Sequence, residues 1–524
     1  MLLLNIINYL NGGNKLSSNK ITLIMAMLVL AVFALGSVSA AENVTTDIDV
    51  PTEEIEIDDS VVEEVEIEDV TEDADVDDNS GNIRSSDIHV NSGMTLNQIQ
   101  GNISNAADGS TIYFDSGNYT DISLTLRSNV IYSGYGAKLI GTGSNHVFSV
   151  ASCSNFVIAG FEIDVNNMAQ NFAAIRGNFV ENATIYDNTI YNGYSAINIF
   201  RHYNNITVRD NIIENMTYDA ISFANPMTFP ENALANLTNT KIYNNRVRNV
   251  QFGIFIGGNF KGNIYNNTVT NSIEGIQFLG KPDGNIGNLV GSVTNNAISN
   301  VAYGIDFINQ TVVDLTVDSN NIDNSGYGIY MINTTVNSFD ITYNTFTNLN
   351  TAINIFDSEV NGLNLNSNDF SNMGTAINMD NINISDSTFD SNVFTGMNNG
   401  IKMYNINTDN LTMSSNNFTY VGSGIDIVNA TLDGFTLQYN NMTGVNIGVN
   451  MTNTSIVYVV IDSNRIITSH FSDEYTILNG ANVSKEYGGY LQLTSNYLYG
   501  CINNSFFFMV DWDDENNTGM VIVG

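Results

Sequence analysis

A phrase of 24 residues repeats between residues 288 and 470, and no other feature of the sequence constrains the fold as strongly. One asparagine marks each copy, at positions spaced 24 residues apart: Asn296, Asn320, Asn344, Asn368, Asn392, Asn416, Asn440 and Asn464. An apolar residue lies three positions before each Asn and another lies two positions after it, as Val317 and Ile322 do around Asn320. A fixed period of this length indicates a stacked repeat whose units bury their apolar sides against each other.

Each unit contains three short pieces in which apolar and polar residues alternate: before the Asn, just after it, and in a Gly/Ala-Ile-x-apolar step such as 304–307. Alternation is the signature of a strand, because successive side chains point to opposite faces. Asn, Gly, Ser and Asp, which favour turns, separate the pieces. Three strands and three corners predict one coil of a parallel β-helix. Coils about 4.8 Å apart would stack each Asn on the next, and an amide both donates and accepts.

A leucine-rich repeat is the alternative fold. Residues 315–322 match its L-x-L-x-x-N-x-L core, and 24 residues is an ordinary length for it. That repeat continues with a helical or 3₁₀ segment, whereas here Ile329, Tyr330 and Met331 alternate behind a glycine. The repeats are also poor in helix-forming residues. The sequence therefore favours the all-β parallel β-helix.

The net charge and the N-terminal segments limit the classes of function that the chain can have. The formal net charge of −38 excludes a general nucleic-acid binder. Lys15 and Lys20 precede an apolar run at 21–35 and a Val-Ser-Ala step at 38–40, so residues 1–40 predict an N-terminal extension with a secretory signal, the alternative being a retained anchor. Residues 41–85 predict an extended acidic spacer, because 42–80 carry 18 Asp or Glu and no Lys or Arg. Cys153 and Cys501 are expected to be thiols rather than a bridge.

Residues 92–120 have the pattern of a β-helix opening. Leu96, Ile99, Ile103 and Ala107 mark one face of a short helix that would cover the end of the stack, and 109–114 begin a strand. The chain here resembles the pectin-lyase-like right-handed parallel β-helix proteins, whose first coil commonly follows a capping helix and a Gly-x-Thr-Ile…Gly-x-Tyr stretch. Its Asn-Asn-x-Ile…Gly-Ile-x-Ile units are similar to the generic parallel β-helix repeat. With the signal and the Asn/Thr-rich composition, they are similar to adhesin-like surface proteins of methanogenic archaea.

The resemblance covers about residues 90–500 and implies a right-handed, single-stranded parallel β-helix at 86–500, with 501–524 as a C-terminal cap or a truncated tail. It says little about chemistry. The first anchors are spaced irregularly: Asn188, Asn211, Asn245 and Asn267. Insertions at 224–236 and 279–288 account for the long intervals. In a regular stack both leave from the same edge two coils apart, where solenoids place binding surfaces.

Seven of the 16 basic residues lie in these same coils. Residues two before each Asn should face solvent, and on four successive coils they are Tyr186, Arg209, Tyr243 and Tyr265. Stacked aromatics and an arginine are typical of a surface that carries sugar rings, with Lys241 and Arg248 holding acidic groups. The alternative is a cross-strand ladder that only stabilises the sheet.

Catalysis has weaker support. Several β-helix relatives cleave polyuronates with clustered Asp residues or with Ca²⁺, but the Gly-His-Gly step of the hydrolases is missing. Asp187 and Asp210, one before the Asn on adjacent coils, are the best candidate pair, although corner Asp residues usually form turns. The histidines are scattered (His89, His146, His202 and His470), so neither a metal site nor a catalytic triad is expected. No cofactor is expected, except Ca²⁺ if the chain is a lyase.

The sequence thus predicts a secreted or cell-surface, adhesin-like β-helix protein. Its expected partners are environmental or cell-surface glycans, or surface proteins of another cell, with no nucleic acid and no membrane span after signal cleavage. Dense Asn-x-Ser/Thr sequons, Asn118 and Asn182 among them, predict glycosylation. Two alternatives stay open: a lyase or glycoside hydrolase acting on acidic polysaccharide, and a structural spacer of the cell envelope.

Overall fold

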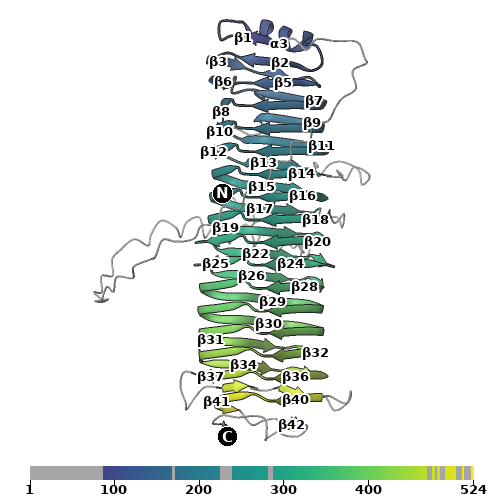
Figure 1. The fold of residues 1–524 in the computed structure, drawn as a ribbon, viewed down its shortest axis with the longest axis vertical. Coiled ribbons are helices and arrows are strands. Elements are labelled where there is room, and N and C mark those ends of the chain that lie inside the picture. Colours follow the sequence, from purple (N-terminus) through teal and green to yellow (C-terminus); the bar gives the residue numbers. More distant parts are fainter. Residues whose placement is uncertain are drawn as a thin grey trace, which may run out of the picture. The chain divides into compact units, whose positions relative to one another are not determined.

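The computed structural model describes residues 87–167, 172–224, 239–280 and 287–468, followed by 475–477, 481–483, 490–502, 510–512 and 521–523. They all belong to the second of two units of the chain, 81–524. This unit is a stack of coils of parallel strands (Figure 1). The parallel β-helix prediction is confirmed. The leucine-rich repeat is wrong, because β22 (Tyr327–Ile332) takes the place of the helical segment that such a repeat requires.

Three sheets form the walls of the stack. The first sheet precedes the anchor Asn of each coil, the second follows it, and the third contains the Gly/Ala-Ile-x-apolar step. The first sheet contains β1 (Ile88–Val90), β2 (Ser110–Phe114), β5 (Val130–Ser133), β14 (Thr240–Tyr243), β16 (Phe260–Tyr265), β18 (Gly287–Thr294), β24 (Phe339–Thr342), β28 (Leu363–Asn366), β36 (Tyr458–Asp462), β40 (Tyr490–Thr494) and β42 (Val510–Trp512). The second contains β3 (Gly117–Ile122), β6 (Ala137–Gly141), β8 (Glu162–Asn167), β10 (Thr189–Gly193), β12 (Ile212–Met216), β21 (Asn321–Asp323), β25 (Thr345–Thr347), β33 (Asn441–Val445) and β37 (Arg465–Thr468). The third contains β4 (Leu124–Thr125), β13 (Asp219–Ala224), β22, β26 (Thr351–Phe356), β34 (Ile447–Thr452), β38 (Tyr475–Ile477) and β43 (Val521–Val523).

Other strands run through a corner from one sheet into the next, or link the third sheet to the first. The strands that pass a corner are β7 (Phe148–Ala159), β9 (Ala173–Tyr186), β11 (Ser195–Arg209), β15 (Arg246–Gly257), β17 (Thr268–Leu279), β19 (Ala297–Ile308), β20 (Gln310–Asp318), β29 (Asp369–Asp390), β30 (Val393–Ser414), β31 (Asn417–Val428), β32 (Thr431–Gln438) and β41 (Tyr497–Ile502). The short links are β23 (Thr335–Val336), β27 (Glu359–Asn361), β35 (Thr454–Ile456) and β39 (Ala481–Val483). Every strand pairing is parallel, and in the regular coils the partner lies 24 residues away, as Leu315 pairs with Phe339.

Alternation along each strand places apolar side chains inside the stack. In β19, Ile305 and Phe307 are buried in the core, and Asp306 between them points to the other side. The phenyl rings of Phe346, Phe370, Phe394 and Phe418 stack from coil to coil with centroids 5.2, 5.0 and 4.3 Å apart. Hence repetition of the sequence becomes repetition of packing, and each coil completes the core of its neighbours.

The anchor asparagines form one buried column at the corner between the first and second sheets. The Oδ1 of Asn368 accepts the backbone N–H of Asn344 at 3.0 Å and the Nδ2 of the same residue at 3.1 Å. Its own Nδ2 donates to the carbonyl of Ile341 at 2.7 Å. The pattern holds for the anchors from Asn211 to Asn464, and the structure adds Asn496 to the column. Asn188 begins the column, and its Oδ1 accepts the backbone N–H of Phe161 instead. Each amide thereby ties its coil to the next.

A helix closes the end of the stack, as the sequence predicts. In α3 (Leu96–Asn105), Thr95 forms a capping box with Gln98, and Ile99 and Ile103 pack into the core. In Figure 1, α3 lies across the first strands. The expected signal at 1–40, the spacer at 41–85, most of both insertions and His470 lie outside the described residues. Cys153 is a buried free thiol. No helix of the described part has the length and apolar character needed to cross a membrane.

The Asn column predicts a large effect for a single amide. Replacing Asn368 with Ala removes four side-chain hydrogen bonds and leaves the Asn344 donors unpaired in the core, so the free energy of unfolding should fall by about 2–4 kcal/mol. Urea denaturation followed by circular dichroism measures it. Asn407→Ala is the matched control, because that exposed amide only donates to Asn383. Equal effects of the two substitutions would contradict a structural role for the column.

Candidate functional site

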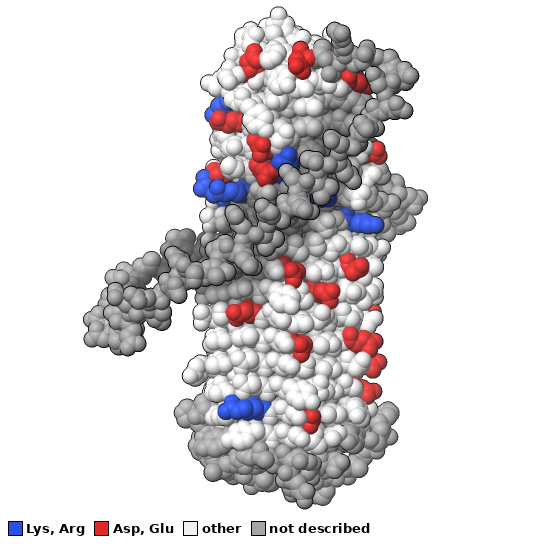
Figure 2. Space-filling view, in the orientation of Figure 1, with Lys and Arg blue, Asp and Glu red and all other residues white. Residues whose placement is uncertain are grey.

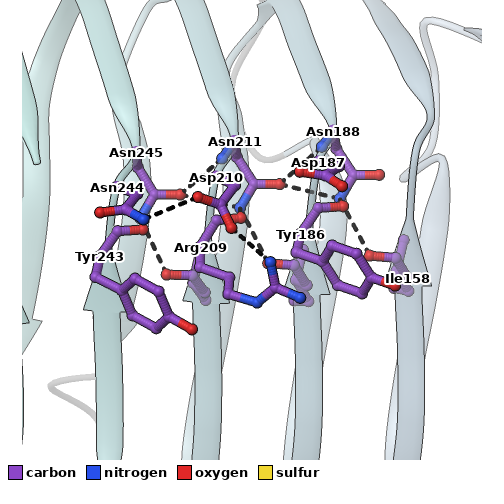
Figure 3. Close-up of polar contacts among 12 residues, drawn as sticks. Ile158, Tyr186, Asp187, Asn188, Arg209, Asp210, Asn211, Tyr243, Asn244 and Asn245 are labelled. Carbon is purple, nitrogen blue, oxygen red and sulfur yellow. Dashed lines mark hydrogen bonds and ion pairs between the residues drawn. The ribbon is translucent and has the colours of Figure 1, made fainter. Parts of the chain in front are cut away.

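The residues two before each anchor form a straight row on the first sheet, called here the tyrosine–arginine row: Tyr186, Arg209, Tyr243 and Tyr265. They belong to β9, β11, β14 and β16, and each pairs in register with the next. Figure 3 shows Tyr186, Arg209 and Tyr243 pointing the same way beside the Asn corner. All four are half-buried. The four coils thus bring together four side chains that lie 23, 34 and 22 residues apart in the sequence.

The members of the row stack on each other. The rings of Tyr243 and Tyr265 lie 4.7 Å apart with planes 5° from parallel, and the guanidinium carbon of Arg209 lies 4.0 Å from the centre of the Tyr186 ring. These faces are therefore covered within the row. What the row offers to a ligand is ring edges, phenol hydroxyls and guanidinium N–H groups, which bind by hydrogen bonds rather than by broad stacking.

The two candidate acids flank this row at the corner. Asp210 accepts from Arg209 Nη1 at 2.5 Å and from Asn244 Nδ2 at 3.0 Å, and Asp187 accepts from the Tyr135 hydroxyl at 2.9 Å. Both have left-handed backbone, with φ of 57° and 54°. Asn and Ser occupy the same corner position in other coils with the same φ, as Asn244 and Ser319 do. These contacts give the two carboxylates a turn-forming role and, for Asp210, neutralisation of Arg209.

The two accessory cations lie on different sheets. Lys241 is exposed in β14, two residues before Tyr243, so it faces the same side as the row. Arg248 lies in the part of β15 that pairs with β12 of the second sheet, and its Nη2 is 2.6 Å from Glu214 Oε2. The structure therefore brings Lys241 to the row and separates Arg248 from it.

A second cluster of chemistry-bearing residues, which the sequence does not single out, lies on the outer side of the third sheet. It consists of the residue between two buried positions in each Gly/Ala-Ile-x-apolar step, called here the outer row of the third sheet: Arg176, Asn198, Ser222, Phe255, Gln277, Asp306 and Tyr330. The sequence signal that could have revealed this row is the usually polar residue between the two apolar residues of each step. The two insertions leave the stack just after this sheet, following β13 and β17.

Three carboxyl groups on this side have raised pKa values. Burial raises the pKa of Asp219 to about 7, although the hydrogen bond with Ser222 and the charge of Arg176 both act to lower it. Burial, and then the neighbouring Asp306, holds the pKa of Glu274 well above its usual range. The pKa of Asp306 is also raised by burial, although Gln277 donates to its carboxylate at 2.8 Å. Glu274 and Asp306 are thus neighbouring carboxyls whose pKa values are both raised, and within the described residues Glu274 Oε2 and Asp306 Oδ1 have no hydrogen-bond partner.

Aromatic rings border the carboxyl pair. Tyr303 and Tyr327 stack at 5.2 Å, and Tyr330 meets both edge-on at 5.1 and 5.4 Å. Figure 2 shows Lys and Arg mainly over the upper coils of the face in view, with one patch near the lower end of the described coils. No three His, Cys, Asp or Glu side chains of the described residues are grouped as metal ligands. The irregular coils therefore combine aromatic, cationic and carboxyl groups on two outer faces.

Comparisons with known proteins bear on the fold. A family model described as "Right handed beta helix region" matches residues 145–290, and this agrees with the coils described above. A search of curated proteins returned no match. Similar solved structures include the exopolygalacturonases of Yersinia enterocolitica and Thermotoga maritima and the tailspike protein of E. coli bacteriophage HK620, each 12% identical.

The alignments cover 77%, 63% and 81% of this chain and 78%, 92% and 74% of the respective structures, with TM-scores of 0.38, 0.42 and 0.35. Likenesses of this strength carry no argument about ligand or chemistry. The chain is a right-handed parallel β-helix, and its chemistry has to be inferred from its own side chains.

The raised pKa of Asp219 predicts a pH dependence of stability. Because its folded pKa of about 7 exceeds the ordinary value of 3.8, the stabilisation from proton uptake is complete below about pH 4 and is lost as the pH rises through 7. Asp219→Asn removes this loss. The free energy of unfolding of the variant should therefore rise relative to that of the parent by up to about 4 kcal/mol between pH 4 and pH 8. Urea midpoints at the two pH values measure it, with the exposed Asp433→Asn as control. A parent and variant that respond equally to pH would refute the assignment.

Proposed function

We propose that the chain is an exported, adhesin-like surface protein that binds glycans through the tyrosine–arginine row and Lys241. The observation that carries the proposal is the in-register row of hydrogen-bonding side chains on four successive coils. A row with equivalent groups one strand spacing apart, about 4.8 Å, suits a ligand that is itself a polymer of similar units. Export rests on the signal-like segment at 1–40, and the similarity to archaeal adhesin-like proteins is part of the proposal.

The charges around the row favour a hydroxyl-rich ligand. Arg209 is neutralised by Asp210 at 2.5 Å, so the row itself is close to neutral apart from Lys241. The net charge of −38 opposes nucleic acid. The phenol hydroxyls, the guanidinium N–H groups and the ammonium can all donate hydrogen bonds to the hydroxyl oxygens of a sugar. The phenol oxygens can also accept hydrogen bonds from the sugar hydroxyls. A neutral or mildly acidic glycan fits this set.

Removal of the tyrosine pair tests the binding surface. We expect the Tyr243→Ala/Tyr265→Ala double variant to lose at least roughly 10-fold in affinity for any glycan that the full-length chain retains on a glycan array, since two aromatic contacts and their hydroxyls are removed. Tyr343→Ala is the control, because Tyr343 is exposed on a coil outside the row. If the double variant lowers the melting temperature while its glycan affinity is unchanged, the row is a stabilising ladder and the proposal fails.

A second candidate function, cleavage of a polysaccharide, is favoured by one observation, the neighbouring carboxyls Glu274 and Asp306, whose pKa values are both raised. A carboxyl that holds its proton near neutral pH suits the role of general acid. However, burial favours the protonated form of both carboxyls, whereas a glycosidase needs an ionised nucleophile or base beside the acid. Asp306 would therefore orient and tune Glu274, and another base would be needed. This is why glycan binding takes precedence.

Incubation with polysaccharides separates binding from processing. With the full-length chain we expect no reducing ends or unsaturated products from polygalacturonate, alginate or a neutral β-glucan, with or without Ca²⁺, measured by reducing-sugar assay and absorbance at the wavelength of unsaturated uronates. Release of product that Glu274→Gln abolishes would establish the second candidate. Release abolished by Asp187→Asn or Asp210→Asn would instead assign catalysis to the corner acids. A chain that neither binds nor cleaves would be a structural spacer of the envelope.

A further inference from the structure

A shallow hollow opens on the outer side of the third sheet, one face away from the tyrosine–arginine row. Its volume is about 260 Å³, and its lining is Ser149, Val150, Ala151, Arg176, Asn178, Phe200 and Arg201. These residues come from β7, β9 and β11, whose segments pair in register. The floor is therefore held by three successive coils of the rigid sheet, and an apolar surface lies beneath two guanidinium groups.

Arg176 is the unusual member of the hollow. Its guanidinium carbon lies 3.3 Å from the centre of the Phe200 ring. Within the described part of the chain, Arg176 makes no hydrogen bond and no ion pair of 4.0 Å or less. Burial lowers its pKa to about 10, so it remains charged at neutral pH. The group thus keeps a full set of planar N–H donors in a fixed position, as recognition of a carboxylate requires.

The groups around Arg176 leave that charge available. Asp219 is the acid whose charge acts on Arg176, but the Asp219 carboxylate accepts from Asn198 Nδ2 at 3.3 Å, and its pKa is raised to about 7. His146 is kept neutral, because burial and then Arg176 lower its pKa to about 4, and its Nδ1 accepts the backbone N–H of Ala173 at 3.0 Å. The Oδ1 atom of Asn178 is buried without a hydrogen-bond partner.

The two faces of the guanidinium also differ. One face is covered by Phe200, which holds the plane of the fork. An anion approaching in that plane would meet two parallel N–H groups, while Val150, Ala151 and Phe200 would contact carbon atoms of the same ligand. A flat or weakly polar ring bearing one acidic group matches this combination of a cationic fork and an apolar floor.

We propose that this hollow is a subsite for the carboxylate of an acidic sugar, bound in the plane of the Arg176 guanidinium with the sugar ring against Phe200, Val150 and Ala151. Asn178 supplies a further polar contact at the rim, where its amide can present either the carbonyl or the NH₂ group. The inference rests on the proposed function only for the class of ligand, since it uses a different sheet and different residues from the tyrosine–arginine row.

Titration of the full-length chain with sodium glucuronate tests the subsite. We expect saturable binding by calorimetry, no comparable binding of glucose, and weakening of roughly 10-fold or more in Arg176→Gln, because a charged, two-point hydrogen bond is lost. Arg176→Lys should weaken binding nearly as much, because an ammonium cannot reproduce the fork. Arg248→Gln is the matched control, since Arg248 is exposed on the second sheet and paired with Glu214.

The remaining outcomes decide against the subsite or separate it from the proposed function. Equal affinity for glucose and glucuronate, or glucuronate binding that survives in Arg176→Gln, would overturn the inference. If the chain prefers glucose 6-sulfate, the group bound by the hollow is a sulfate ester and not a carboxylate. If it binds a blocked diglutamate peptide more strongly, the ligand is an acidic peptide and not a sugar. Circular dichroism melting shows that the variants are folded. Glucuronate binding that persists in Tyr243→Ala/Tyr265→Ala keeps this subsite even if the row fails.

Discussion

The hydrogen bonds of the buried Asn column are the constraint on which the rest of the stack depends. Each Oδ1 accepts two N–H groups of the preceding coil, and each Nδ2 donates to a carbonyl of that coil, as Asn320 does with Asn296 and Val293. A buried amide needs hydrogen-bond partners. If one coil were displaced by one residue, several buried N–H and C=O groups would lose their partners at once. The column therefore reinforces the register that the alternation of buried and outward side chains also sets, since a slip of one residue would turn the apolar side chains outward.

This constraint also explains where the chain tolerates irregularity. Successive anchors lie 23, 34, 22 and 29 residues apart in the early coils and 32 apart at the end, yet the same amide-to-amide bonds form each time. The extra residues of the early coils leave after the third sheet, far from the Asn corner along the coil. Insertions there change the outer surface without breaking the column, whereas an insertion between the first sheet and the Asn would break it.

Much of this was available in the sequence, because period and alternation are local properties. The Asn positions, the outward direction of Tyr186 and Tyr243, and the capping face of Ile99 and Ile103 follow directly from spacing. Contacts between side chains do not follow. Parity could not show that Tyr243 and Tyr265 cover each other's faces, nor that Arg248 forms an ion pair with Glu214. Glu274 and Asp306 are 32 residues apart, so the insertion between them hides that they are neighbours in adjacent coils.

The outer rows differ in whether their polar groups are already satisfied. In the regular coils, Thr342 donates to Asp318 at 2.7 Å, Asn378 to Asn354 at 2.8 Å and Asn450 to Asp426 at 2.7 Å, so neighbouring coils saturate one another. A ligand would have to displace those bonds for little net gain.

In the irregular coils the pattern changes. Within the described residues, the guanidinium of Arg176 and the Oδ1 of Asn178 have no hydrogen-bond partner, and both lie beside an apolar floor. Free energy for binding is available where the stack has left donors and acceptors unpaired. That condition is met on the third sheet at Arg176 and Asn178, and Phe200 of the same hollow pairs with Ala224, where the first insertion leaves the stack. The regular coils extend the column, whereas the proposed subsite lies in coils where the repeat is least exact.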